Sequence, residues 1–188
     1  MIIEVILNKI YALFLRANKS IHFDGKVHIK NRPIIDVRNE GILRIGDNVS
    51  INSKNKTYHI NMFAPVKIFS RIKGSVIIIG RNTRIHGSCI HANERIEIGE
   101  NCLIAANCQI FDNSGHDIYS KNRLDVSTKS KPILIEDNVW VGMGCIIMPG
   151  SIIGEGSVIA AGSVVRGIYK KNTLISGNPA IAVKTIST

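Results

Sequence analysis

The chain has 188 residues and a formal net charge of +10, from 24 lysines and arginines against 14 aspartates and glutamates. This length suits a single domain with a continuous core, and the basic charge favours an anionic partner such as a phosphorylated cofactor, an anionic sugar or a membrane surface. Nucleic acid is not expected as a partner, because the chain has no run of six basic residues and only 5% aromatic residues to stack on bases.

The first 16 residues carry apolar side chains at helical spacing, which predicts one amphipathic helix within an N-terminal segment of residues 1–20. The segment is too short and too interrupted by charge to span a membrane, and it lacks the cleavage site of a signal peptide. Two roles remain open for it. The helix could cap the exposed end of the following domain, or its Lys9, Arg16 and Lys19 could contact anionic lipids at the inner face of a membrane.

Residues 21–188 are predicted to form an all-β solenoid, because a six-residue repeat runs through much of this segment. Each repeat opens with a large aliphatic residue and holds a small or medium residue at its fifth place, so each flat segment points two side chains inward. Three such segments close a triangular coil, and stacked coils pair through parallel ladders about 4.8 Å apart. A β-sandwich would show period two and turns of variable length. The clearest run of opening residues is Ile135, Val141, Ile147, Ile153, Ile159 and Val165, after blocks at Ile45, Ile79 and Ile98.

The six-residue spacing slips between the blocks, most of all from Ile110 to Ile135. A slip in a solenoid predicts a loop on its wall, and loops are where function concentrates. We therefore expect a protruding loop at about residues 112–134. A second irregular stretch covers residues 53–70, and we assign no chemical role to it.

The cysteines are expected to be small buried hydrophobes, because all four occupy the fifth, inward place of a repeat. Unpaired thiols fit a reducing cytoplasm. Neither a disulfide nor a metal site is expected from them. The four residues are Cys89, Cys102, Cys108 and Cys145.

Two histidines with four residues between them, His86 and His91, resemble the paired zinc ligands of gamma-class carbonic anhydrases. A catalytic zinc needs three protein ligands and an open position for water. The third imidazole of those enzymes would fall near Ser50, which is not a histidine. No metal is therefore expected.

The predicted loop opens with the most reactive set of side chains in the chain. Gly115 permits an unusual backbone angle, and His116 follows it, flanked by Asp112 and Asp117. Imidazole titrates near neutrality and suits a general base, and a carboxylate on its other nitrogen would fix its tautomer. The candidate catalytic residues are thus His116, Asp112 and Asp117.

Four stretches together resemble a known family. They are Ile98 to His116, the Val-Trp-Val-Gly that starts at Val139, the run from Ile159 to Val165, and the Gly-Asn-Pro-Ala that starts at Gly177. The set is similar to the hexapeptide-repeat acyltransferases, in particular the sugar O-acetyltransferases of polysaccharide biosynthesis related to maltose and galactoside acetyltransferases. The resemblance covers roughly residues 40 to 184.

The resemblance implies a left-handed parallel β-helix that assembles as a homotrimer, with acetyl-CoA bound as a co-substrate between neighbouring subunits and no permanent cofactor. It implies that His116 is the catalytic base and that Trp140 lies beside the active site. Met143 departs from the small polar residue common in relatives, and Gly167 departs from a common lysine. The resemblance also implies contacts to the pantetheine arm of the cofactor at one set of positions and contacts to its nucleotide end at another. The expected cofactor-binding residues are Trp140, then Gly142, Met143, Ala160 and Ala161 along the pantetheine arm, and Arg166 and Lys184 at the nucleotide end.

The expected function is an acetyl-CoA-dependent O-acetyltransferase that acts on a sugar hydroxyl by direct transfer. His116 would take the hydroxyl proton, and backbone N–H groups near Trp140 to Gly142 would stabilise the oxyanion. We expect a cytoplasmic protein, free or peripheral to the inner membrane. An N-acetyltransferase of an amino sugar nucleotide and a non-catalytic solenoid scaffold remain as alternatives.

Overall fold

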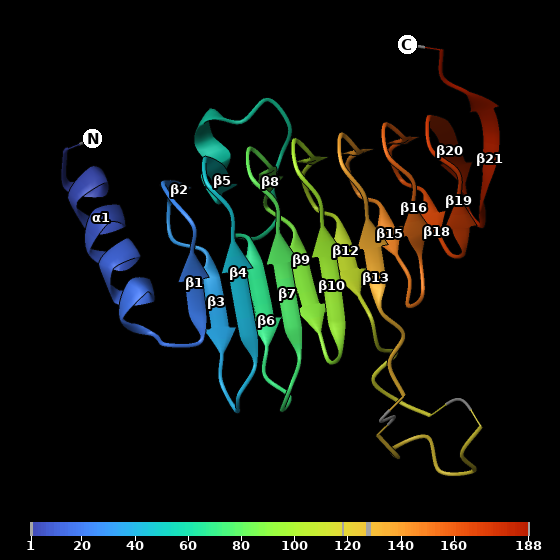
Figure 1. Ribbon diagram of the computed structural model, residues 1–188, viewed down its shortest axis with the longest axis horizontal. Coiled ribbons are helices and arrows are strands. Elements are labelled where there is room, and N and C mark those ends of the chain that lie inside the picture. Colours follow the sequence, from blue (N-terminus) through green and yellow to red (C-terminus); the bar gives the residue numbers. More distant parts are fainter. Residues whose placement is uncertain (1, 118, 127–128, 188) are drawn as a thin grey trace.

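The computed structural model describes residues 2–117, 119–126 and 129–187. One helix, α1 (Ile2–Ala17), stands at the N-terminal end of a long three-sided coil, and the C-terminal strands stand at the opposite end (Figure 1). Every strand pair is parallel except the last, β20 with β21. The solenoid predicted from the six-residue repeat is confirmed.

The strands form three sheets, one for each side of the coil, and successive strands along the chain move from sheet A to sheet B to sheet C. Sheet A contains β1 (Ile21–Phe23), β4 (Ile42–Ile45), β7 (Val76–Ile79), β10 (Arg95–Ile98), β13 (Ile133–Ile135), β16 (Ile152–Ile153) and β19 (Ile168–Tyr169). Sheet B contains β2 (Val27–Lys30), β5 (Val49–Asn52), β8 (Arg84–His86), β11 (Leu103–Ile104), β14 (Trp140–Val141), β17 (Val158–Ile159), β20 (Thr173–Gly177) and β21 (Ala180–Thr185). Sheet C contains β3 (Ile34–Val37), β6 (Lys67–Ser70), β9 (Cys89–Ala92), β12 (Gln109–Phe111), β15 (Ile146–Ile147) and β18 (Val164–Val165).

The core is a set of stacked aliphatic columns, because parallel pairing places the same repeat position of each coil above the last. In sheet A, Ile45 pairs with Ile79, which pairs with Ile98, and the column continues through Ile135 and Ile153. These side chains are at most 1% exposed. Burial of successive isoleucines at about 25 cal/mol per Å² of apolar surface is the main stabilising contribution of the coil.

The corner between sheets A and B repeats one turn in coil after coil. An asparagine there adopts a left-handed backbone, which asparagine tolerates better than most residues. Its side chain continues a ladder along the corner: Asn48 donates to Asn82 at 2.9 Å, and Asn82 donates to Asn101 at 3.0 Å. The asparagines with positive φ at this corner are Asn48, Asn82, Asn101, Asn138 and Asn172.

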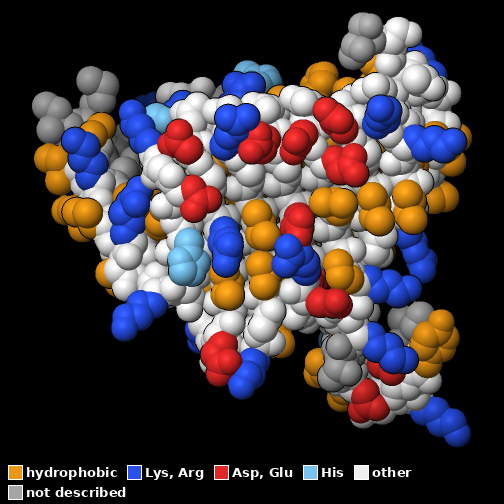
Figure 2. Space-filling view, in the orientation of Figure 1, with side chains coloured by type: hydrophobic (Ala, Val, Ile, Leu, Met, Phe, Trp, Pro, Cys, Tyr) orange, Lys and Arg blue, Asp and Glu red, His pale blue; other side chains and the backbone are white. Residues whose placement is uncertain are grey.

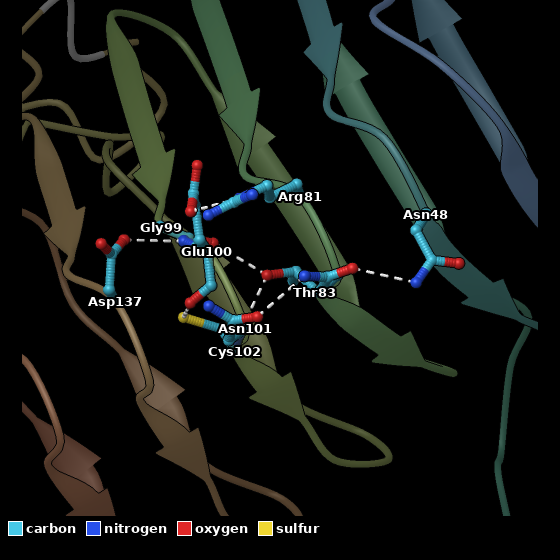
Figure 3. A network of polar contacts seen from close by, with 9 residues as sticks. Asn48, Arg81, Thr83, Gly99, Glu100, Asn101, Cys102 and Asp137 are labelled. Carbon is cyan, nitrogen blue, oxygen red and sulfur yellow. Dashed lines mark hydrogen bonds and ion pairs between the residues drawn. The ribbon is translucent and has the colours of Figure 1, made fainter.

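Polar side chains also tie neighbouring coils together at the same corner (Figure 3). The Asp137 carboxylate accepts the N–H of Glu100 at 2.7 Å, and Arg81 contacts the Glu100 carboxylate at 2.6 Å. Just inside, the Thr83 hydroxyl donates to the Gly99 carbonyl at 2.8 Å and accepts the N–H of Cys102 at 3.0 Å. The charged side chains of Asp137, Glu100 and Arg81 therefore help to hold neighbouring coils together.

The expectation that all four cysteines point inward is wrong for Cys89. Three of them are buried, but Cys89 is half-buried on the outer side of sheet C. The inward Ile85 and Ile90 are five positions apart, whereas the inward Ile104 and Ile110 of the next coil are six apart. The corner after β8 is shortened in this way, so Ser88 takes the small inward place and donates to the Ala105 carbonyl at 2.8 Å. The repeat pattern cannot reveal which residue of a shortened corner turns outward.

Two wall loops interrupt the coil where the spacing slips. The first spans residues 53–66 and contains the short 3-10 helix η1 (Asn55–Thr57); the irregular stretch expected to reach residue 70 ends earlier, because β6 begins at Lys67. The second, residues 112–132, leaves the coil between β12 and β13 and hangs below the other turns (Figure 1). Residues 118, 127 and 128 of the expected loop lie outside the described residues.

Candidate functional site

His116 lies in the second wall loop, and its side chain is exposed. Gly115 precedes it with a φ of 81°, the conformation for which a glycine was expected. The loop folds back on itself through bridges that join Asn113 to Ser130 and His116 to Val126. An exposed imidazole on a tethered loop is available to a substrate that approaches from solvent.

Asp112 does not accompany His116 as expected. It is fully buried, and its two carboxylate oxygens accept the backbone N–H groups of Asn93, Glu94 and Arg95, each at 2.8 Å. The carboxylate therefore faces the preceding coil and fixes the point where the loop leaves. We correct the expected catalytic role of Asp112 to an anchoring role.

Asp117 remains beside His116 in the chain and is half-buried. One of its carboxylate oxygens accepts the N–H of Tyr119 at 2.9 Å, and its own N–H donates to the Asp125 carbonyl at 3.1 Å. These contacts shape the loop around His116. They leave its expected catalytic role a prediction.

The expected pantetheine contacts form a row along the corner between sheets B and C. Gly142 and Met143 follow β14, and Ala160 and Ala161 follow β17 one coil further on. A Cβ at Gly142 would lie 2.6 Å from the Ala161 nitrogen, so only glycine lets the two coils approach this closely. Trp140 begins the row and exposes half of its side chain.

Two backbone N–H groups in the stretch expected to supply oxyanion donors are hydrogen-bonded within the sheet. The N–H of Trp140 donates to the Ser157 carbonyl at 3.0 Å, and the N–H of Gly142 donates to the Ile159 carbonyl at 2.8 Å. Both are ladder bonds of the sheet. These two N–H groups therefore already have partners, and the expected oxyanion role of backbone N–H groups near Trp140 to Gly142 stays a prediction.

The two expected nucleotide-end residues, Arg166 and Lys184, line one open cleft of about 830 Å³ at the C-terminal end of the coil. Lys170 and Lys171, which sequence reasoning missed, line the same cleft, next to the apolar Ile168. The sequence signal that could have identified them is the Lys-Lys pair at a corner of the coil. Four cations beside apolar side chains suit a ligand that carries both phosphates and a flat or aliphatic part.

A second cleft, about 400 Å³ on the outside of sheet A, has the opposite charge. Glu97, Glu136, Asp137 and Glu155 line it, and Figure 2 shows acidic side chains gathered above a row of hydrophobic ones there. Phosphates would be repelled at this cleft. The C-terminal cleft is therefore the better match for an anionic nucleotide.

The structure does not bring the whole candidate site together in one chain. The His116 loop leaves the edge between sheets C and A, whereas the row from Trp140 to Ala161 follows the edge between sheets B and C. Figure 1 shows the loop hanging from its own edge of the coil. His116 and Trp140 therefore lie on different edges of the three-sided coil.

His86 and His91 both lie on the outside of the coil, as half-buried side chains. The His86 ring stacks on Tyr58 with centroids 4.5 Å apart, and burial together with nearby Arg84 and Lys30 lowers the pKa of His86 to about 4. Among residues 2–117, 119–126 and 129–187, no three histidines, cysteines or acids are grouped to hold a metal ion. His86 is thus a neutral, stacked side chain.

Comparison with known proteins identifies the family. Residues 132–167 match the family described as bacterial transferase hexapeptide (six repeats), and residues 76–111 match the hexapeptide repeat of succinyl-transferase. The polysialic acid O-acetyltransferase of Escherichia coli O1:K1 / APEC is 42% identical over 117 residues, which are 60% of this chain and 37% of that protein. The matched segments span about half, or less, of the length of the curated relatives.

Two solved structures share the fold. One is a hexapeptide-repeat acetyltransferase from Vibrio cholerae O1 biovar eltor in complex with acetyl-CoA, with a TM-score of 0.67 and 26% identity over 97% of this chain and 79% of that one. The other is a polysialic-acid-specific acetyltransferase, with a TM-score of 0.53 and 30% identity over 89% of this chain and 72% of that one. The chain belongs to the hexapeptide-repeat acyltransferase family, and the expected left-handed parallel β-helix is confirmed.

Proposed function

We propose that this protein is an acetyl-CoA-dependent O-acetyltransferase that modifies a sugar hydroxyl during surface polysaccharide biosynthesis in the cytoplasm. The observation that carries the proposal is the cationic C-terminal cleft, at the end of the coil toward which the row from Trp140 to Ala161 runs. A relative that aligns with 97% of this chain binds acetyl-CoA, and a curated relative is named for O-acetylation of polysialic acid.

The proposed reaction is direct transfer. The His116 imidazole takes the proton of the acceptor hydroxyl while its oxygen attacks the thioester carbonyl carbon. The carbon–sulfur bond breaks, and the leaving CoA thiolate receives the proton from the imidazolium. The products are an acetylated sugar and the free CoA thiol, and the two bound substrates need no other reactant.

The proposed assembly is a homotrimer with its active sites between subunits. His116 and Trp140 lie on different edges of one chain, so neither edge alone holds both parts of the site. In a closed ring of three, the loop edge of each subunit meets the row edge of the next. Such an arrangement completes three equivalent sites.

The test is release of the CoA thiol from acetyl-CoA with a panel of sugars, sugar nucleotides and lipid-linked oligosaccharides. His116→Ala should lower turnover by about 100-fold to 10,000-fold, the usual contribution of a general base. His22→Ala, which changes an exposed histidine on sheet A, is the matched control and should leave turnover unchanged.

Three results would change the proposal. Full turnover in His116→Ala would remove His116 as the base. Thiol release only with amino sugar nucleotides would replace O-acetylation by N-acetylation. Failure to bind acetyl-CoA in calorimetry would favour the non-catalytic scaffold.

A further inference from the structure

Helix α1 carries its apolar face on the outside of the molecule. Ile6, Ile10, Leu13 and Phe14 follow the spacing of one helical face, and they are 50%, 57%, 67% and 72% exposed. An amphipathic helix that served only to cap the coil would turn this face inward. The exposed apolar face of α1 therefore needs another explanation.

The opposite side of α1 is fastened to the first coil, so the outward direction of the apolar face is fixed. Leu15 is buried in the core, and the Tyr11 hydroxyl donates to the Pro33 carbonyl at 2.9 Å. Arg16 donates to the Gly25 carbonyl at 2.8 Å and stacks over Phe23. The helix thus caps the coil with one side and exposes its apolar side to solvent.

Basic residues lie beside the exposed face. Residues 1–38 contain seven lysines and arginines against three acids. Lys9 and Lys30 line one groove between α1 and β2, and the exposed Lys19 follows the helix. Figure 2 shows Lys and Arg side chains beside the hydrophobic ones at this end of the molecule.

We propose that the exposed face of α1 docks on an anionic lipid bilayer, with the helix lying in the plane of the interface. The 16 residues extend for about 24 Å; the apolar side chains of the exposed face enter the boundary of headgroups and acyl chains, and the flanking lysines meet lipid phosphates. A two-fold contact with a second copy of the chain fits less well, because it would set the same basic rim against itself; a head-to-tail contact within a ring is the outcome that the sedimentation test below checks. This inference is independent of the proposed catalytic activity.

The first test is flotation of the full-length protein with vesicles. The protein should float with phosphatidylcholine vesicles that contain phosphatidylglycerol and much less with phosphatidylcholine alone, and added salt should weaken the binding. Replacing two exposed anchors by Leu13→Ser with Phe14→Ser should weaken binding by about 100-fold, given the usual gain from burying such side chains. Ile72→Ser, at a half-exposed isoleucine in the turn between β6 and β7, is the matched control and should bind like the wild type.

The second test separates charge from apolar contact. Lys9→Glu with Lys19→Glu should remove the preference for anionic vesicles, whereas Lys56→Glu with Lys121→Glu, the same charge change elsewhere on the surface, should keep it. Thermal unfolding checks that each variant is folded. The proposal is overturned if the wild type ignores anionic vesicles, or if the Leu13/Phe14 variant binds them equally well. It is also overturned if that variant changes only the oligomeric state in sedimentation.

Discussion

At the scale of single residues, the loop shows what a short motif can and cannot predict. The glycine before His116 has the positive φ that its position suggested. Asp112 had the same sequence signal as Asp117, a carboxylate near a histidine. The two differ in burial and in their partners, and the partners of Asp112 lie 17 to 19 residues away, on the preceding coil. Proximity in sequence therefore could not tell an anchor from a catalytic partner.

The anchoring role of Asp112 makes a prediction about stability. Asp112→Asn replaces one acceptor oxygen by an N–H₂ group that would face backbone N–H donors, so the free energy of unfolding should fall by about 2 kcal/mol. Urea unfolding measures the change. Asp125→Asn, in the exposed part of the same loop, should cost less than about 0.5 kcal/mol. Unaltered unfolding together with a loss of turnover like that of His116→Ala would return Asp112 to the catalytic residues.

At the scale of elements, the strands were predictable where the repeat is unbroken, because each inward site then demands a large aliphatic residue. β13 to β18 follow from Ile135 to Val165 in this way. For the wall loops, the sequence predicted only where they interrupt the repeat, and not their shapes. The shape of the first loop depends on contacts such as the Asn107 side chain donating to the Asn61 carbonyl at 2.8 Å, which join residues 46 apart. No local pattern encodes such contacts.

The C-terminal cleft makes a prediction at this scale, because the turns on either side of β19, together with β21, carry its cations. Lys170→Ala with Lys171→Ala should raise the Kd for acetyl-CoA by about tenfold, since each lost contact to a phosphate is worth a fraction of a kcal/mol to about 1 kcal/mol at an exposed site. Calorimetry measures the change. The loss should shrink with 3′-dephospho-CoA if one of these lysines meets the 3′-phosphate. Unchanged affinity for acetyl-CoA would move the nucleotide end out of this cleft.

At the scale of the whole molecule, the coil separates what the sequence brings close. Residues 116 and 140 lie only 24 positions apart, but the loop and the row occupy different edges because each strand turns the chain to a new side. The six-residue period predicts that they lie on different edges, since three segments make one coil. It does not contain the assembly that we propose to bring the two edges together. No helix within the described ranges is long and apolar enough to span a membrane.

The shared site can be tested by mixing two inactive variants. His116→Ala keeps an intact row, and Ala161→Glu keeps an intact loop but places a carboxylate in the path of the pantetheine arm. In a ring of three, every mixed trimer contains one interface with a wild-type loop and a wild-type row. Co-refolding at equal amounts should therefore restore about a quarter of wild-type turnover, with each variant alone as the control and sedimentation to confirm the trimer. A site contained within one chain would stay inactive in every mixture, because no subunit would then hold both an intact loop and an intact row.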